Sequence, residues 1–257
     1  MILPSIGNND VLFHYQAPTR EQKAKYYSDL FSVWFESQVR LSEDEKAGIK
    51  ATFCAGGFYR FDMGPEQSLI ALNTLYLNSE NKADPDEASV QLAWLQAQLE
   101  RAEREEPARK FLLSMHIYPG SFYFYGHKAN LLFDAPQMQL LALLDAHQHQ
   151  LQAVLAAHTH QAQVAYPYAP SRTTHGAPNQ PMRDHFALAL LTTPSVSPVF
   201  FNNPSYTLLE VSTQQDRFLR HFSTHSLQLY MYLGFRQEVW TELDFSDVYP
   251  PNTMNSA

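Results

Sequence analysis

The chain has 257 residues, 45% of them hydrophobic and 17% charged, and its formal net charge at pH 7 is -8. This composition excludes an intrinsically disordered chain, because enough apolar side chains are present to form a core. The sequence contains no apolar run of the roughly 18 residues that a membrane-spanning helix needs. It also lacks a basic stripe, so we expect neither a membrane span nor a nucleic-acid partner. The single cysteine, Cys54, excludes an intramolecular disulfide.

Residues 1–7 have the apolar character of the end of a buried strand that runs into a Gly-Asn turn. They lack the basic and apolar regions of a signal peptide, so the sequence assigns no cellular compartment. Because a domain seldom begins within its core, we expect that an N-terminal part of the fold is missing from this sequence.

A capping box at Thr19 and Gln22 predicts a helix from residue 20 onward. The apolar residues of this segment recur at helical spacing, and we interpret them as core packing rather than as a ligand-binding surface. They are Tyr26, Tyr27, Leu30, Phe31, Trp34 and Phe35.

A second capping box, at residues 42–45, predicts a short helix. Residues 51–61 then have the composition of a strand, and the pair Gly56 and Gly57 indicates a β-bulge within it. Residues 68–75 are apolar almost throughout, which predicts a short buried strand.

The clearest helix is predicted at residues 84–106, where leucines fall on one face and charged residues on the other. A buried strand at 110–116 follows. Next come a helix at 134–150 and a strand at 151–157 that ends at His158. The side chains expected to point inward from the helix at 134–150 are Met138, Leu141 and Leu144.

Residues 166–184 are rich in proline, threonine and asparagine, which predicts a long loop. Strands are predicted at 186–192, 206–212 and 217–222. Strands alternate with helices in the first half, which predicts crossover units, and follow one another in the second half, which predicts antiparallel hairpins. The expected fold class is therefore α/β, with mixed sheets flanked by helices.

Polar residues stand where three predicted strands end, and ligands bind at such ends in open α/β sheets. These residues are Asn8 in the Gly-Asn turn, His116, and the pair His158 and His160. On an extended strand, His158 and His160 would point to the same side, as two ligands of one metal site do. Taken singly, each feature has a simpler interpretation: an Asx turn, or histidines without a function.

Together, these segments resemble the last three motifs of the calcineurin-like metallophosphoesterases, which read Gly-Asn-His-Asp/Glu, a single histidine, and Gly-His-x-His. In this chain they read Gly7-Asn8-Asn9-Asp10, His116 followed by Ile-Tyr-Pro-Gly, and Ala157-His158-Thr159-His160. Further segments resemble the acid-sphingomyelinase-like branch of the family, which includes endopolyphosphatases. These segments are residues 72–76, 94–99, 116–120, 194–198 and 202–206.

The resemblance implies a two-sheet sandwich with helices outside, a four-layer αββα arrangement, over residues 1–215. Residues 216–257 would be an extension packed on that domain. The expected partner is a small-molecule or lipid phosphate ester substrate, and phospholipid, polyphosphate, nucleotide and phosphoprotein all stay open.

Members of the family hold two divalent metal ions, which bind the phosphate and activate the attacking water. By resemblance, Asn8, His116 and His158 would bind the second of these ions, and His160 would bind the first. The resemblance implies Zn, Mn or Fe, and imidazole nitrogens and an amide oxygen suit these metals.

Two features depart from the family pattern. The first two family motifs, Asp-x-His and Gly-Asp-x-x-Asp, precede the Gly-Asn turn, but only six residues precede it here. The bridging carboxylate of the family is then absent, and we expect at most one metal ion in this chain instead of two. The second departure is Asn9, which stands where most of the family has a histidine, and an amide cannot donate a proton at neutral pH as that histidine does.

The candidate catalytic residues are Asn9, Asp10 and His14. By resemblance, Asp10 corresponds to the acid that orients the family's histidine, and His14, from the same loop, is a candidate substitute for that histidine. An exposed loop histidine without a function is the simpler interpretation of His14.

The sequence thus favours a metal-dependent hydrolase of phosphoric esters or anhydrides, with its activity impaired in this chain. The alternative is a non-catalytic relic of the same family that serves in binding or assembly. The substrate, the compartment and the oligomeric state stay open.

Overall fold

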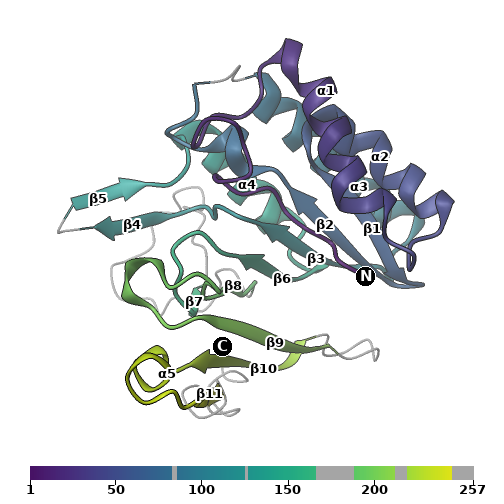
Figure 1. Cartoon of the computed structure of the whole chain (residues 1–257). Helices are drawn as coiled ribbons and strands as arrows, with labels where there is room; N and C mark the ends of the chain where they lie inside the picture. Colours follow the sequence, from purple (N-terminus) through teal and green to yellow (C-terminus); the bar gives the residue numbers. More distant parts are fainter. Residues whose placement is uncertain (83–85, 125–126, 166–187, 212–218, 245–257) are drawn as a thin grey trace, which may run out of the picture. The chain divides into compact units, whose positions relative to one another are not determined.

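The computed structural model describes residues 1–82, 86–124, 127–165, 188–211 and 219–244. The chain divides into two compact units, Met1–His158 and Thr159–Ala257. Helices and strands both contribute, so the protein is a mixed α/β protein, as predicted (Figure 1). The phosphoesterase domain expected over residues 1–215 stays a prediction.

The first unit is built on a mixed sheet in which the strand order is β1-β2-β3-β6. β1 and β2 form an antiparallel hairpin, whereas β2, β3 and β6 run parallel to one another. The strands are Tyr59–Gly64 (β1), Gln67–Leu72 (β2), Lys110–Met115 (β3) and Leu151–Ala156 (β6).

Helices make both parallel connections, which confirms the predicted crossover units. α3 (Asp86–Glu105) joins β2 to β3 and buries Leu92, Leu95 and Leu99. The hairpin of β4 (Ser121–Phe124) and β5 (His127–Asn130) lies between β3 and α4. α4 (Asp134–Ala146) then leads to β6, and α3 and α4 contact each other. Because the strands are parallel, the chain leaves β2, β3 and β6 at the same edge of the sheet.

The apolar stripe after residue 20 packs into the core, as predicted. α1 (Arg20–Phe31) continues into a π-helix, η1 (Ser32–Glu36). Along these two segments, Tyr27, Phe31 and Phe35 are buried, and their rings lie within 6.3 Å of the Phe53 ring, centroid to centroid. Phe53 belongs to the second helix, which packs beside α1 (Figure 1).

The strand predicted at residues 51–61 is wrong, because α2 (Glu43–Gly56) runs through most of it. Gly57 ends this helix with a left-handed backbone, φ 76°, and its N–H donates to the Phe53 carbonyl. A glycine pair is typical of this helix ending as well as of a bulge, and composition alone does not separate the two. The next strand, β1, begins only at Tyr59.

Two smaller predictions also need correction. β2 ends at Leu72, and Asn73 caps a 3-10 helix, η2 (Thr74–Leu77), where a strand to residue 75 was expected. Met138 is 42% exposed instead of inward, although Leu141 and Leu144 are buried.

The expected N-terminal strand is not formed: residues 1–7 pair with no strand in the described part of the chain. Side chains hold this segment in place instead. The Tyr59 hydroxyl donates to the Pro4 carbonyl over 2.9 Å, and the hydroxyls of Ser5 and Ser114 lie 2.7 Å apart. Ile6 is fully buried. The segment is thus fixed beside β1 and β3 without ladder hydrogen bonds.

The second unit consists of antiparallel strands, as predicted for this half of the chain. β7 pairs with β8, and a separate sheet has the order β11-β10-β9. The predicted loop at 166–184 lies outside the described residues. The elements are Gln163–Ala165 (β7), Leu190–Thr192 (β8), Val199–Phe201 (η3), Ser205–Val211 (β9), Leu219–Leu227 (β10), Leu229–Phe235 (α5) and Trp240–Asp244 (β11).

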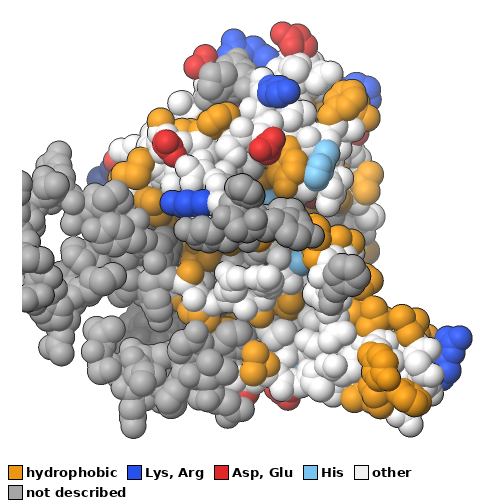
Figure 2. Space-filling view, turned by 90° about the vertical axis from the view of Figure 1, so that its left-hand side faces the viewer, with side chains coloured by type: hydrophobic (Ala, Val, Ile, Leu, Met, Phe, Trp, Pro, Cys, Tyr) orange, Lys and Arg blue, Asp and Glu red, His pale blue; other side chains and the backbone are white. Residues whose placement is uncertain are grey.

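The short helix α5 is apolar yet buries none of its residues. Tyr230, Leu233 and Phe235 are among its most exposed side chains, and Figure 2 shows hydrophobic side chains gathered on the surface. Within the described residues, no helix combines the length and the apolar character needed to cross a membrane.

Gly57→Ala is expected to lower the free energy of unfolding by about 1–3 kcal/mol, because a left-handed backbone strains alanine. The new Cβ would also lie 2.8 Å from Tyr27 Cε1. Urea unfolding measures the change. Gly48→Ala is the matched control: it lies in the same helix, and a Cβ there meets nothing within 4 Å. The control should be neutral or stabilise by up to about 1 kcal/mol, so equal losses at both glycines would contradict this account.

Candidate metal centre

Two of the predicted metal ligands follow neighbouring parallel strands. β3 ends at Met115 and β6 ends at Ala156, so His116 and His158 both lie at the carboxyl edge of the sheet. The Ala157 N–H donates to the His116 carbonyl oxygen over 3.0 Å, which ties the two strand ends together. Parallel pairing therefore brings these two imidazoles to the place where α/β sheets bind ligands.

Asn8, the third predicted ligand, contacts both imidazoles with one atom. Its Oδ1 lies 2.7 Å from His116 Nε2 and 3.2 Å from His158 Nδ1. The centroids of the two rings are 5.2 Å apart. Asn8 is only 5% exposed, so its amide depends on such contacts for hydrogen bonds. The structure thus brings together three of the four side chains that the sequence singled out as ligands, and their role stays a prediction.

A tight turn presents Asn8 to the histidines. The Gly7 N–H donates to Asp10 Oδ2 over 2.7 Å, and the Asp10 N–H donates to the Gly7 carbonyl over 3.1 Å. Gly7 also leaves space for His116, because an added Cβ would lie 3.1 Å from the nearest atoms of its ring. The carboxylate of Asp10 therefore shapes the turn that positions Asn8.

The two remaining catalytic candidates are placed differently. His14 Nε2 lies 2.7 Å from Asn8 Nδ2, so His14 contacts the cluster through the other end of the Asn8 amide. Because an amide nitrogen only donates, His14 Nε2 accepts this hydrogen bond. Asn9, by contrast, is exposed on the turn.

Tyr15 belongs to the cluster although no sequence motif marked it. Its hydroxyl lies 3.2 Å from His158 Nε2. Burial, and secondly the charge of Glu80, raises the pKa of Tyr15, so the hydroxyl stays protonated at neutral pH. Tyr15 and His158 both have left-handed backbones, with φ of 63° and 74°. Strain of this kind is common at functional sites, and it leaves no signal in the sequence.

The predicted alternation of His158 and His160 along a strand is wrong. Both residues lie beyond the end of β6, and φ is 74° at His158 and 59° at His160, so neither is extended. Strand geometry therefore does not align the two rings. His160 belongs to the second unit, where its ring centroid lies 5.3 Å from that of Phe200.

The donors of this cluster suit a single divalent ion. One amide oxygen and two imidazole nitrogens are ligands that Zn, Mn and Fe accept, and in this structure they converge around Asn8 Oδ1. No group of three or more His, Cys, Asp or Glu side chains that could hold a metal ion occurs among the residues described. The candidate ligand set therefore consists of the two histidines and the Asn8 amide.

Searches against protein-family models and against curated proteins found no match to this chain. The resemblance to the calcineurin-like metallophosphoesterases therefore rests on the motifs around Asn8, His116 and His158 and on the further segments that resemble the acid-sphingomyelinase-like branch.

The Asn8 amide dictates the tautomers of the metal-free cluster. Because Oδ1 only accepts, we expect the proton on Nε2 of His116 and on Nδ1 of His158. Long-range ¹H–¹⁵N NMR near pH 8 distinguishes the two tautomers of each imidazole. Asn8→Ala should abolish both preferences and leave the exposed His149 unchanged. A protonated Nδ1 on His116 in the wild-type chain would contradict this hydrogen-bond pattern.

Proposed function

We propose that the first unit binds one divalent metal ion through Asn8, His116 and His158, and that the chain is a metal-dependent hydrolase of phosphoric esters or anhydrides whose activity is impaired because it holds one ion instead of two. The observation that carries this proposal is the position of Asn8 Oδ1, 2.7 Å and 3.2 Å from one nitrogen of each histidine. Asn8 is more than 100 positions away from each histidine in the sequence, and the two histidines follow different strands. A four-layer αββα sandwich over residues 1–215 is the fold that this proposal entails.

Each residue of the cluster then has a defined task. The bound ion would supply the positive charge that orients and polarises a phosphoryl oxygen. His116 would face the ion with an unprotonated Nε2, and His158 with an unprotonated Nδ1, which leaves the His158 proton on Nε2. The Tyr15 oxygen would accept a hydrogen bond from that N–H and fix the orientation of the ring.

His14 is the cluster residue suited to moving a proton. Its ring lies beside Asn8 and packs against Tyr15, with ring centroids 4.3 Å apart. Histidine is the side chain most often used for proton transfer at neutral pH. In this proposal His14 stands in for the histidine that the resemblance would place at Asn9.

A binding protein without catalysis is the second candidate, and Asn9 is the observation that favours it. Asn9 is exposed and carries an amide, which has no proton to give to a leaving group. One metal ion also lacks the symmetric clamp with which a metal pair stabilises both the attacking and the leaving oxygen.

Calorimetric titration with Zn²⁺ or Mn²⁺ tests the metal site. We expect one ion per chain. His158→Ala should weaken binding by more than about 100-fold, because even the loss of an outer-shell partner of a ligand costs 10–100-fold.

Two histidine variants serve as controls for that titration. His149→Ala removes an exposed imidazole that lies outside the cluster, and His160→Ala removes the predicted ligand that belongs to the second unit. Both should retain most of the affinity. Two ions per chain, or an equal loss in His160→Ala, would show that the ligand assignment is wrong.

Hydrolysis of a generic aryl phosphodiester by this chain is expected to stay at or near the background rate. The physical reason is the single ion, which cannot clamp both oxygens of an in-line displacement. Release of nitrophenolate with and without Mn²⁺ measures the rate. A clear metal-dependent rate that disappears in His116→Ala would establish catalysis and reveal further ligands.

A further inference from the structure

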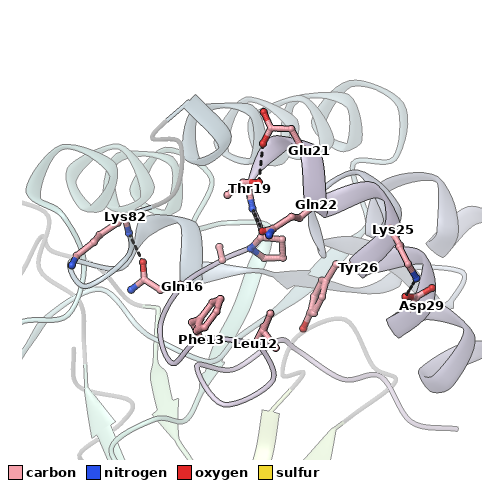
Figure 3. Close-up of a pocket in the computed structure, with 12 residues that line it drawn as sticks. Leu12, Phe13, Gln16, Thr19, Glu21, Gln22, Lys25, Tyr26, Asp29 and Lys82 are labelled. Atoms are coloured by element: carbon pink, nitrogen blue, oxygen red, sulfur yellow. Dashed lines mark hydrogen bonds and ion pairs between the residues drawn. The ribbon is translucent and has the colours of Figure 1, made fainter.

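A pocket of about 650 Å³ belongs entirely to the first unit. One wall comes from the loop after the Gly-Asn turn, with Leu12, Phe13 and Gln16. Other wall residues come from the segment that leads into α1, with Pro18, and from α1 itself, with Tyr26. Figure 3 shows Leu12, Phe13 and Tyr26 lying together below the first turn of α1.

The pocket offers apolar surface to a ligand. Leu12 is 79% exposed and Phe13 is 65% exposed, although both are large apolar residues. Adjacent exposed apolar side chains that line a hollow are typical of a binding site.

The polar side chains of the pocket bond to protein groups. Gln16 donates to the Glu80 carbonyl over 2.8 Å and accepts from the Lys82 N–H over 3.0 Å. Gln22 accepts from the Thr19 N–H over 3.2 Å (Figure 3). Because these groups already have partners, the surface left for a ligand is mainly that of the apolar residues.

The charges around the pocket balance one another. Two positively charged residues, Lys25 and Lys82, and two negatively charged residues, Glu21 and Asp29, line the pocket. Lys25 forms an ion pair with Asp29. A pocket without excess positive charge has little attraction for a polyanion such as polyphosphate. An apolar group fits it better.

One loop joins the pocket to the metal centre. His14 and Tyr15 contact Asn8 and His158, whereas their neighbours on either side, Phe13 and Gln16, line the pocket. The Gln16 N–H donates to the Phe13 carbonyl over 2.8 Å and closes this segment into a turn.

The pocket is also tied to the turn that presents Asn8. The Tyr26 hydroxyl, on the pocket wall, donates to the carbonyl oxygen of Asp10. Burial, followed by the charge of Asp10, raises the pKa of Tyr26 to about 12, so this donor keeps its proton at neutral pH.

We propose that this pocket binds the apolar organic group of a phosphate ester whose phosphate lies at the Asn8, His116 and His158 centre. The inference rests on the proposed function and adds the substrate class: esters of apolar or aromatic alcohols rather than polyphosphates. Binding energy from a group remote from the reacting bond is a common means of holding a substrate in place.

Three probes test the proposal on the Mn²⁺-loaded chain by calorimetry: 2-naphthyl phosphate, methyl phosphate and 2-naphthol. 2-Naphthyl phosphate should bind at least about tenfold more tightly than methyl phosphate, because its ring is removed from water. In the double variant Leu12→Ser/Phe13→Ser, this advantage should fall below about threefold. The affinities for Mn²⁺ and for methyl phosphate should not change.

The matched control is Val33→Ser/Val39→Ser. These valines are 73% and 95% exposed in the same unit but do not line the pocket, so the control should keep the full preference for 2-naphthyl phosphate. Equal affinities of the two phosphates in the wild-type chain would overturn the pocket assignment. An equal loss in the control and in the pocket variant would overturn it as well.

His116→Ala separates a failure of this inference from a failure of the proposed function. If both hold, the variant loses Mn²⁺ and binds 2-naphthyl phosphate no better than 2-naphthol. If it binds 2-naphthyl phosphate as tightly as the wild-type chain does, the proposed function is overturned and the placement of the phosphate falls with it. If Mn²⁺-dependent phosphate binding is normal but the naphthyl group adds nothing, only the pocket assignment is wrong.

Discussion

The candidate centre depends on one buried side-chain amide. Asn8 has to satisfy a carbonyl oxygen and an NH₂ group away from water, and the structure meets this need with three histidine side chains. Two of them follow parallel strands of one sheet, and the third comes from the loop that follows Asn8. In the proposed function, the oxygen that orients the rings would also be the third donor for a metal ion. Hydrogen bonding in the metal-free state thus holds the side chains near the positions that a metal would require.

The predictions from the sequence succeeded where a periodic pattern had a single structural solution. The leucine face of residues 84–106 specifies a helix, and the apolar runs at 110–116 and 151–157 specify two buried strands. α3, β3 and β6 lie at these positions. The aromatic stripe after residue 20 specifies a core helix for the same reason. These elements are enough to place His116 and His158 at one edge of the sheet.

The predictions failed where the backbone departs from regular structure. Gly56 and Gly57 fit a bulge and a helix end equally well by composition, and the tertiary structure selects the helix end. The left-handed backbones at Tyr15, His158 and His160 have no sequence signature, because none of these residues is a glycine. For this reason, no pattern in the sequence indicated the contact between Tyr15 and His158. For the same reason, the sequence wrongly predicted that His158 and His160 alternate along a strand. Residues 1–7 are held by single side-chain bonds, which apolar patterning does not distinguish from a strand.

The loop between Asn8 and α1 links the two features that bear on function. Its inner residues complete the histidine cluster, and its neighbouring residues form the wall of an apolar pocket. A ligand that engages both would contact the candidate metal ligands and α1 at once. Such a ligand would cover the large apolar side chains that this loop exposes.

We propose that Asn8, His116 and His158 bind one metal ion together, and anomalous diffraction from a crystal of the chain grown with Zn²⁺ would locate that ion. We expect one main anomalous peak, about 2.0–2.2 Å from Asn8 Oδ1, His116 Nε2 and His158 Nδ1. A peak bound elsewhere, or one that contacts His158 through Nε2 and leaves Asn8 without contact, would contradict it.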